Sequence, residues 1–481
     1  MRKKWKLGLM STLLACTTFT SVAFAAEKPV DQPKWEEWLH EHAKRLHEPT
    51  SQTTKDLSFL KEAVKDKRIV VLGESTHGAK EINQSKIRMI KYLHEEMGYD
   101  VIAFESGLAE ASAVQQNFDR LTATEAMKQS LEGVWQTEEI EQLFIYMKEQ
   151  KEKGTPLTLA GFDINLFYHS PFYPYAKEWL QKLSPEVASE FDTAVTELIR
   201  LDKYYYNLEG TYPYDQYKRD IQPVINKFEG VRTFIQNHKA ELTQVAPHPT
   251  YDVNFLEKSI SIRIDAIKTH LDADMKAKGG ILSPTLTDYS FYIRDQKMAQ
   301  NLAWLTEMQH KNKKIIVWGH NYHIRKQNSK MLLDFMKVQQ YNYVAPNMMD
   351  YLPQRIKNQM YTIGVFAYSG SSWNSNNKDI ITVHNEHEEQ SVEKIISTVG
   401  SPNVFVNLKG ESKRPETSWM FTPTASSYWG DKEREEIMVP TEQYDGILWL
   451  EKTTPSFLVM IARKQHTIRC IQILTIKQYI H

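Results

Sequence analysis

Short apolar segments recur along this chain, and longer segments with apolar residues every three or four positions separate them. Most of the short segments are continuously apolar, which is typical of strands buried on both faces of a parallel sheet. We predict strands at 68–74, 99–106, 156–163, 313–320, 360–368, 403–408 and 444–452. Helical periodicity fills the intervals, for example 86–97 and 298–309. This alternation predicts an α/β fold with a mostly parallel central sheet.

One interval, from about 170 to 312, contains no good strand. Its helical patterns predict a large helical insertion or lobe beside the sheet. Tyrosines cluster within it at 204–206, 212 and 214. Residues 26–50, with two tryptophans, predict an entry helix, so the main domain spans 26–456. The last segment, 457–481, follows the final predicted strand and forms a tail of uncertain structure.

The N-terminus has the features of a cleaved secretory signal. A basic start, Arg2 to Lys6, precedes an apolar, small-residue stretch, and Ala23-Phe24-Ala25 fits the cleavage rule. Residues 1–25 are therefore predicted to be removed, which predicts a secreted or cell-envelope protein. Retention as a membrane anchor is the alternative, and Cys16 also loosely matches a lipoprotein site.

Composition narrows the function classes. The 481 residues are 41% hydrophobic with a formal net charge of −1, which becomes −5 without the four basic signal residues. The basic residues are scattered, so no nucleic-acid partner is expected. No later segment has about 18 uninterrupted apolar residues, so no membrane span is expected in the mature chain. Cys470 would remain as its single cysteine, which excludes a disulfide framework.

Titratable side chains gather where four predicted strands end. In open α/β sheets, ligands bind at the carboxyl ends of the strands. The residues at these ends are Glu74 and His77, Glu105, Asp163, and His320 with His323. Each has a structural alternative as a helix cap, a turn histidine or a helix-start acid. Their coincidence at strand ends nevertheless indicates a site. Residues 384–387 repeat the His-Asn-x-His pattern of 320–323, but they lie among acidic residues, so we predict that they form solvated surface.

The ordered set of motifs resembles the erythromycin esterase family, including succinoglycan-biosynthesis-like members. It consists of Gly73-Glu74-x-x-His77-Gly78, then Phe104-Glu105-Ser106, then Trp318-Gly319-His320-Asn321-x-His323. The resemblance covers most of residues 60–455. It implies an α/β core with helical lobes around a deep cleft. It also implies hydrolysis of a lactone ester, without a metal or other cofactor.

The resemblance also implies residue roles. His77 matches the family's general base, Glu74 the acid beside it, and Glu105 a second essential acid. His320 and His323 match the paired histidines. Lys86 stands where some active esterases have arginine, and Arg294, in Ile293-Arg294-Asp295, matches a substrate-side or structural position.

Ester hydrolysis requires an activated water, a base near neutral pH and stabilisation of the developing oxyanion. Imidazole suits the base, so we expect His77 to take the proton from water. Glu74 or Glu105 would orient the imidazole or the water, and His320, His323 or Lys86 would face the oxyanion. There is no serine-nucleophile elbow, which favours direct attack by water on a small-molecule ester or lactone.

Two other readings remain open. Three histidines and two acids are sufficient ligands for zinc or manganese in a metal-dependent hydrolase. A non-catalytic protein could instead bind a sugar or another metabolite, with Trp135 and the tyrosine cluster as stacking surfaces. Metal content after dialysis would distinguish a metal-dependent hydrolase from a metal-free one. Ligand binding without product formation would identify a non-catalytic binding protein.

Overall fold

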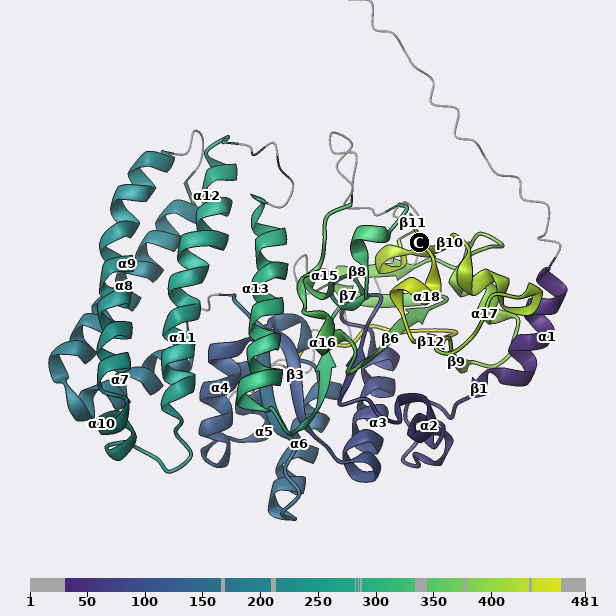
Figure 1. The fold of residues 1–481 in the computed structure, drawn as a ribbon, viewed down its shortest axis with the longest axis horizontal. Coiled ribbons are helices and arrows are strands. Elements are labelled where there is room, and N and C mark those ends of the chain that lie inside the picture. Colours follow the sequence, from purple (N-terminus) through teal and green to yellow (C-terminus); the bar gives the residue numbers. More distant parts are fainter. Residues whose placement is uncertain are drawn as a thin grey trace, which may run out of the picture.

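The computed structural model describes residues 31–165, 169–208, 213–281, 283, 285, 288–333, 344–374, 379–431 and 435–459. Its centre is an eight-stranded sheet in the order β1-β9-β12-β6-β2-β5-β3-β4 (Figure 1). The strands are β1 Lys44–Arg45, β2 Ile69–Leu72, β3 Tyr99–Gly107, β4 Thr158–Asp163, β5 Lys314–Trp318, β6 Met360–Ala367, β9 Asn403–Asn407 and β12 Gly446–Leu450. The run from β12 to β4 is parallel, whereas β9 and β1 are antiparallel additions at one edge. The predicted α/β fold is confirmed.

Every strand predicted from a continuous apolar segment lies in this sheet. The hydrophobic pattern missed β1 and two hairpins, β7 Gly370–Asn374 with β8 Asp379–Val383 and β10 Thr424–Ser427 with β11 Glu435–Met438. These strands are polar or partly exposed, so their sequences carry at most short apolar runs. Their pairing is set by neighbouring backbone rather than by burial of a hydrophobic segment.

The central strand shows why the apolar runs are continuous. All four residues of β2 are fully buried. Ile69 and Val71 pack into the core on one face of the sheet, and Val70 and Leu72 pack into the core on the other. Alternate side chains of a strand point to opposite faces, so a strand covered on both faces must be apolar throughout.

The helical lobe stands beside the sheet, at the left of Figure 1. Its helices are α7 Phe172–Leu183, α8 Pro185–Tyr206, α9 Tyr214–Asn237, α10 Lys239–Gln244, α11 Val253–Ala266, α12 Asp272–Lys278 and α13 Ser290–Trp304. The described residues between 170 and 312 contain no strand, as predicted. Tyr205 and Tyr217 are buried in the lobe's own core, whereas Tyr204 is 55% exposed. Of the predicted tyrosine cluster, Tyr205 thus packs the lobe, while Tyr212 lies outside the described residues. Helix α13 leads the chain back to the sheet.

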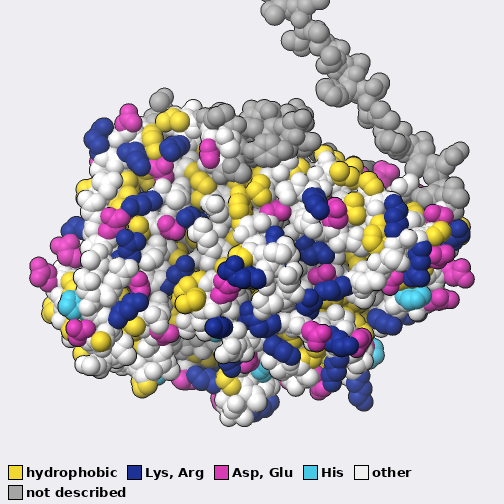
Figure 2. Space-filling model, viewed as in Figure 1, with side chains coloured by type: hydrophobic (Ala, Val, Ile, Leu, Met, Phe, Trp, Pro, Cys, Tyr) yellow, Lys and Arg dark blue, Asp and Glu magenta, His cyan; other side chains and the backbone are white. Residues whose placement is uncertain are grey.

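Shorter and flanking helices complete the fold. They are α1 Gln32–His42, α2 Leu60–Val64, α3 Lys80–Met97, α4 Leu108–Gln116, α5 Ala123–Ser130, α6 Glu138–Glu152, α14 Asn321–Ile324, α15 Met348–Tyr351, α16 Gln354–Lys357, α17 Val392–Ser397 and α18 Pro440–Gln443. The predicted entry helix is α1. No helix of the described ranges is long and apolar enough to cross a membrane. On the face in Figure 2, basic and acidic side chains are interspersed.

The two ends of the chain are described only in part. The predicted signal segment, with Cys16, and residues 460–481, with Cys470, lie outside the described residues. The start of the predicted tail is attached to the domain, because Leu458 forms an isolated bridge with Thr137 and the Val459 N–H donates to the Gln136 carbonyl at 2.8 Å.

Candidate functional site

The loop between β2 and α3 carries the first two candidate residues, and two glycines shape it. A Cβ at Gly73 would lie 2.0 Å from Asn321 Oδ1, so this position admits no side chain where β2 ends. Gly78 has a φ of +64°, and a Cβ there would lie 2.1 Å from the Trp373 carbonyl oxygen. These constraints turn the chain sharply, so that Glu74 and His77 face each other across the loop.

Glu74 is fully buried and accepts hydrogen bonds at both carboxylate oxygens. Oε1 accepts from His77 Nδ1 at 2.5 Å and from the Trp135 indole N–H at 2.9 Å. Oε2 accepts from Lys86 Nζ at 2.8 Å and from the Trp318 indole N–H at 3.0 Å. Four donors thus fix one carboxylate, which in turn fixes the tautomer and direction of the His77 ring.

The electrostatics of this group follow from the buried ion pair. Burial alone would raise the pKa of Glu74, but Lys86 and then His77 outweigh it and hold the pKa well below its usual range. Burial lowers the pKa of Lys86 to about 8, although Glu74 opposes the shift. The Lys86 side chain is 0% exposed and its Nζ lies 3.6 Å from the Trp318 ring centroid. Lys86 therefore sits behind Glu74 instead of at the substrate-side position we expected, because its charge is needed to hold a buried carboxylate.

Replacing Lys86 with arginine should expose this shift in the pH dependence of stability. Between pH 8 and about 10.4 the unfolded wild-type chain still binds a proton that the folded chain has released, so its unfolding free energy rises with pH. An arginine stays charged in both states. We expect the difference in unfolding free energy between wild type and Lys86→Arg to grow in favour of wild type from pH 8 to 10, at about 1.4 kcal/mol per pH unit.

Urea denaturation at several pH values measures this difference. The exposed Lys55→Arg should give a curve parallel to that of wild type. A constant offset between wild type and Lys86→Arg would show that Lys86 keeps an ordinary pKa.

A second group of charges lies at the ends of β3 and β4. Arg294, on α13, donates from Nε to both Asp163 oxygens at 3.1 and 3.0 Å. Its Nη2 donates to Glu105 Oε1 at 2.9 Å. Burial would lower the pKa of Arg294, but Asp163 and then Glu105 raise it well above its ordinary value. The helical lobe therefore contributes a fixed cation to the strand ends, and the Arg294 side chain keeps 15% exposure.

His323 completes this second group. Its Nδ1 lies 2.6 Å from Asp295 Oδ1 and its Nε2 lies 3.4 Å from Glu105 Oε1. Burial would lower the pKa of His323, but Asp295 and then Glu105 outweigh it and raise the pKa. Burial raises the pKa of Asp295, although His323 opposes this. The Arg294 Nη1 also lies 3.4 Å from His323 Nε2, so both ring nitrogens contact charged groups and His323 is part of the charge network rather than a free base.

His320 occupies the space between the two groups. Its backbone N–H donates to Glu105 Oε2 at 2.8 Å, and its Nδ1 accepts from the Tyr322 N–H at 3.2 Å. Its Nε2 then donates to the Ser75 carbonyl at 3.2 Å. Burial, and then His77, hold the pKa of His320 well below its usual range. His320 is therefore neutral, and both of its ring nitrogens are engaged by backbone.

His77 differs from the other two histidines. Within the described part of the chain, its ring makes one hydrogen bond, from Nδ1 to Glu74, and its side chain is 14% exposed. Its Nε2 therefore keeps a lone pair free of protein donors. Three rings surround it: Trp135 at 5.2 Å, His320 at 5.0 Å and Trp429 at 4.9 Å between centroids.

All seven predicted site residues thus belong to two adjoining charge networks. Sequence reasoning gave no role to Asp295 or Trp318 and considered Trp135 only as a stacking surface. It placed Asp163 at a strand end, with a helix cap as the structural alternative. The Asp295 signal was its place beside Arg294, whereas the tryptophans carried none. Residues 384–387, which we predicted to be solvated surface, are not fully solvated. His384 Nε2 lies 2.8 Å from Ser427 Oγ, and His387 Nε2 lies 2.6 Å from the Tyr368 carbonyl oxygen.

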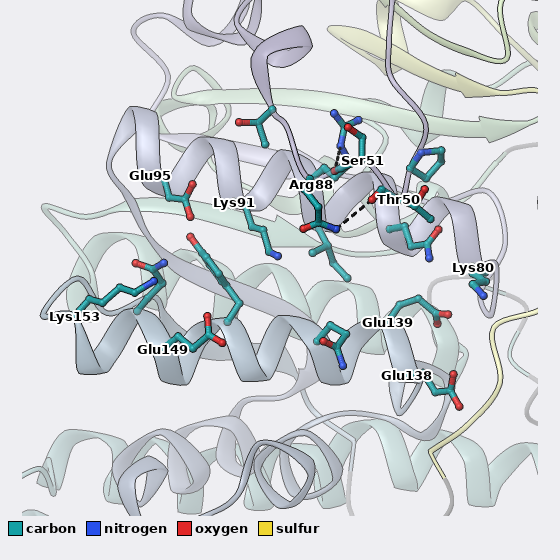
Figure 3. Close-up of a pocket in the computed structure, with 18 residues that line it drawn as sticks. Thr50, Ser51, Lys80, Arg88, Lys91, Glu95, Glu138, Glu139, Glu149 and Lys153 are labelled. Atoms are coloured by element: carbon teal, nitrogen blue, oxygen red, sulfur yellow. Dashed lines mark hydrogen bonds between the residues drawn. The ribbon is translucent and has the colours of Figure 1, made fainter.

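Two further features of the described residues concern metal ligands and a surface hollow. Over the described ranges, no three His, Cys, Asp or Glu side chains converge with a geometry that could hold a metal ion. A hollow of about 620 Å³ lies between α3 and α6, away from the strand-end residues (Figure 3). Basic and acidic side chains mix along it, and Arg88 there is used to hold the 47–56 loop.

Known proteins resemble this chain in sequence and in fold. Residues 94–453 match the family model for erythromycin esterase, which is more than half of the chain. The chain belongs to the erythromycin esterase family. The matched range begins after Glu74, His77 and Lys86, so the placement of these residues comes from the structure.

Relatives within the erythromycin esterase family extend over almost the whole chain. The putative hydrolase YbfO of Bacillus subtilis (strain 168) is 40% identical over 93% of this chain and 97% of its own length. Erythromycin esterase type II of Escherichia coli is 24% identical over 89% of this chain and 99% of its own. Family membership and these relatives together support hydrolase activity.

Solved structures show the same fold. A Bacillus cereus protein superposes with a TM-score of 0.69 at 21% identity, covering 90% of this chain and all of its own. A succinoglycan biosynthesis protein gives a TM-score of 0.67 at 18% identity over 90% of this chain and all of its own. An open-conformation mutant of the erythromycin esterase EreC gives 0.58 at 16% identity over 88% of this chain and 98% of its own.

Proposed function

We propose that this chain hydrolyses a carboxylic ester or macrolide-type lactone by direct attack of water, with His77 as the general base. The observation that carries the proposal is the Glu74–His77 pair. A carboxylate fixed by four donors holds His77 Nδ1, and the opposite nitrogen of the ring remains free to accept a proton. This is the base-plus-orienting-acid geometry that general base catalysis requires.

The Glu74–His77 pair moves the proton during both steps of the reaction. His77 Nε2 takes a proton as the water oxygen adds to the ester carbonyl, and the imidazolium is stabilised by Glu74. Collapse of the tetrahedral adduct breaks the carbon–oxygen bond to the alcohol, and the departing alkoxide takes the proton back from His77. The products are one acid and one alcohol, and the enzyme returns to its starting protonation state.

Arg294 is the cation best suited to the developing negative charge. Lys86 and His320 are committed to buried partners, whereas Arg294 retains some exposure and a charge held firmly by Asp163 and Glu105. We assign the oxyanion or the leaving alkoxide to its guanidinium, with His323 and Glu105 fixing its position. This assignment replaces the expectation from the sequence that His320, His323 or Lys86 faces the oxyanion.

The test uses the mature chain, metal-stripped, incubated with a panel of activated esters and macrolides and followed by mass spectrometry. Without added metal, we expect each hydrolysed macrolide to give a ring-opened product that is heavier by one water, and each hydrolysed ester to give its acid and its alcohol. Turnover that returns only with zinc or manganese would move these side chains from acid–base to ligand roles. Binding without product under both conditions would support a ligand-binding protein.

Export and a role in antibiotic resistance complete the proposal. Macrolide lactones are included because a relative carries the name erythromycin esterase, and the N-terminal segment has the features of a secretory signal. An intact mass corresponding to residues 26–481 in the culture medium would support export.

A further inference from the structure

Trp429 combines an unusual backbone conformation with a position at the proposed site. Its φ is +60°, and among the described residues it is the one non-glycine residue in the left-handed region. Bulky L-residues rarely adopt this conformation, and backbone strain of this kind concentrates at functional sites. The residue lies between β10 and β11, some 350 positions after His77 in the sequence.

The ring of Trp429 contacts two of the site's histidines. It lies perpendicular to His77, with centroids 4.9 Å apart at 89°, and stacks on His320 at 5.2 Å and 29°. The Trp135 ring is also perpendicular to His77, with centroids 5.2 Å apart at 82°. Two indoles thus meet the imidazole at right angles, from loops that are far apart in the chain.

The segment that carries Trp429 is held on both sides. The Ser427 N–H donates to the buried Glu393 carboxylate at 3.0 Å, and the His384 N–H donates to the Gly430 carbonyl at 3.0 Å. These bonds fix the backbone immediately before and after Trp429. They can therefore maintain a conformation that the residue would not adopt by itself.

We infer that Trp429 is a positioning residue for the base: with Trp135 it confines the His77 ring so that Nδ1 stays on Glu74 and Nε2 stays directed at the water. The inference rests on the proposed function and deepens it. Glu74 holds one nitrogen of the imidazole, but one hydrogen bond leaves the ring free to swing about it. The two perpendicular indoles lie in contact with the imidazole, so they restrict that swing by limiting the space into which the ring can turn.

Three substitutions separate this role from simple packing. Trp429→Ala and Trp429→Gly both remove the ring, but only the glycine also relieves the backbone strain. Trp429→Phe keeps an aromatic surface. We expect kcat to fall at least tenfold in the Ala and Gly variants with little change in KM, and to recover largely in the Phe variant. The Gly variant should melt at a higher temperature than the Ala variant.

A readout independent of turnover is the downfield proton resonance of the His77–Glu74 hydrogen bond. It should be sharp in wild type and in Trp429→Phe, and broadened in Trp429→Ala. Trp304→Ala, which removes a half-buried tryptophan of the helical lobe, should leave both the resonance and kcat unchanged. If Trp429→Ala keeps full kcat or a sharp resonance, the positioning role is overturned while the hydrolase proposal stands. If no ester is hydrolysed by wild type, the resonance alone decides the positioning role.

Discussion

Replacing His77 with alanine is expected to lower kcat/KM for ester hydrolysis by about 10²–10⁴-fold, the usual contribution of a general base. The fold should persist. The ring lies at the edge of the site with 14% exposure, and Glu74 retains its bonds to Lys86, Trp135 and Trp318. The lost hydrogen bond to the carboxylate costs about 1.5–3 kcal/mol of unfolding free energy. Steady-state kinetics and thermal unfolding on the same sample measure both quantities.

The control for this loss is His238→Ala, which removes a 42%-exposed histidine of the helical lobe. It should keep wild-type turnover. Added imidazole should restore part of the activity of His77→Ala by entering the vacated space as a base. Full turnover in His77→Ala would exclude His77 as the base, and loss of turnover together with loss of cooperative unfolding would assign it a structural role instead.

Replacing Glu74 with glutamine is expected to destabilise the protein by about 3–5 kcal/mol, the range observed when one member of a buried ion pair is removed. In wild type each carboxylate oxygen of Glu74 accepts two hydrogen bonds, so the side-chain amide nitrogen of the glutamine would face N–H donors. Lys86 would be left as a buried cation without its anion. Turnover should fall as well, because His77 loses the group that orients it. Urea denaturation measures the stability loss.

Two comparisons sharpen this prediction. The exposed Glu62→Gln should change stability by less than about 0.5 kcal/mol. The double variant Glu74→Gln/Lys86→Met should be less destabilised than Glu74→Gln alone, because it removes the unpaired charge. A double variant that is destabilised by the sum of both losses would contradict the ion-pair account.

The pH dependence has a definite sign. The pKa of Glu74 is depressed in the folded state. Its contribution is therefore present above the unfolded pKa of about 4.3 and is lost as pH falls toward the folded value. The stability gap between wild type and Glu74→Gln should accordingly be full at pH 7 and shrink below about pH 4.

The strands and the gathering of the candidate side chains at one edge of the sheet could be predicted from the sequence, because both depend on local information. A strand covered on both faces must be apolar at every position, so runs such as Ile69–Leu72 are visible without a structure. Parallel strands bring their carboxyl ends to one edge. Acids and histidines that follow those runs, such as Glu74, His77 and His320, are therefore expected to meet.

Which of those side chains is free and which is committed was decided only by the tertiary structure. Lys86 has the sequence context of an ordinary helical lysine, yet packing places it behind Glu74. Asp295 pairs with His323 because α13, the last helix of the helical lobe, brings Asp295 back to the sheet. Trp135 and Trp429 reach His77 from loops whose sequences contain no periodic signal. Hydrophobic periodicity reports burial along one element, whereas a hydrogen bond or ring contact depends on the relative placement of several elements. The sequence by itself therefore determined the sheet and the set of reactive groups, and the three-dimensional packing determined which nitrogen is left to accept a proton.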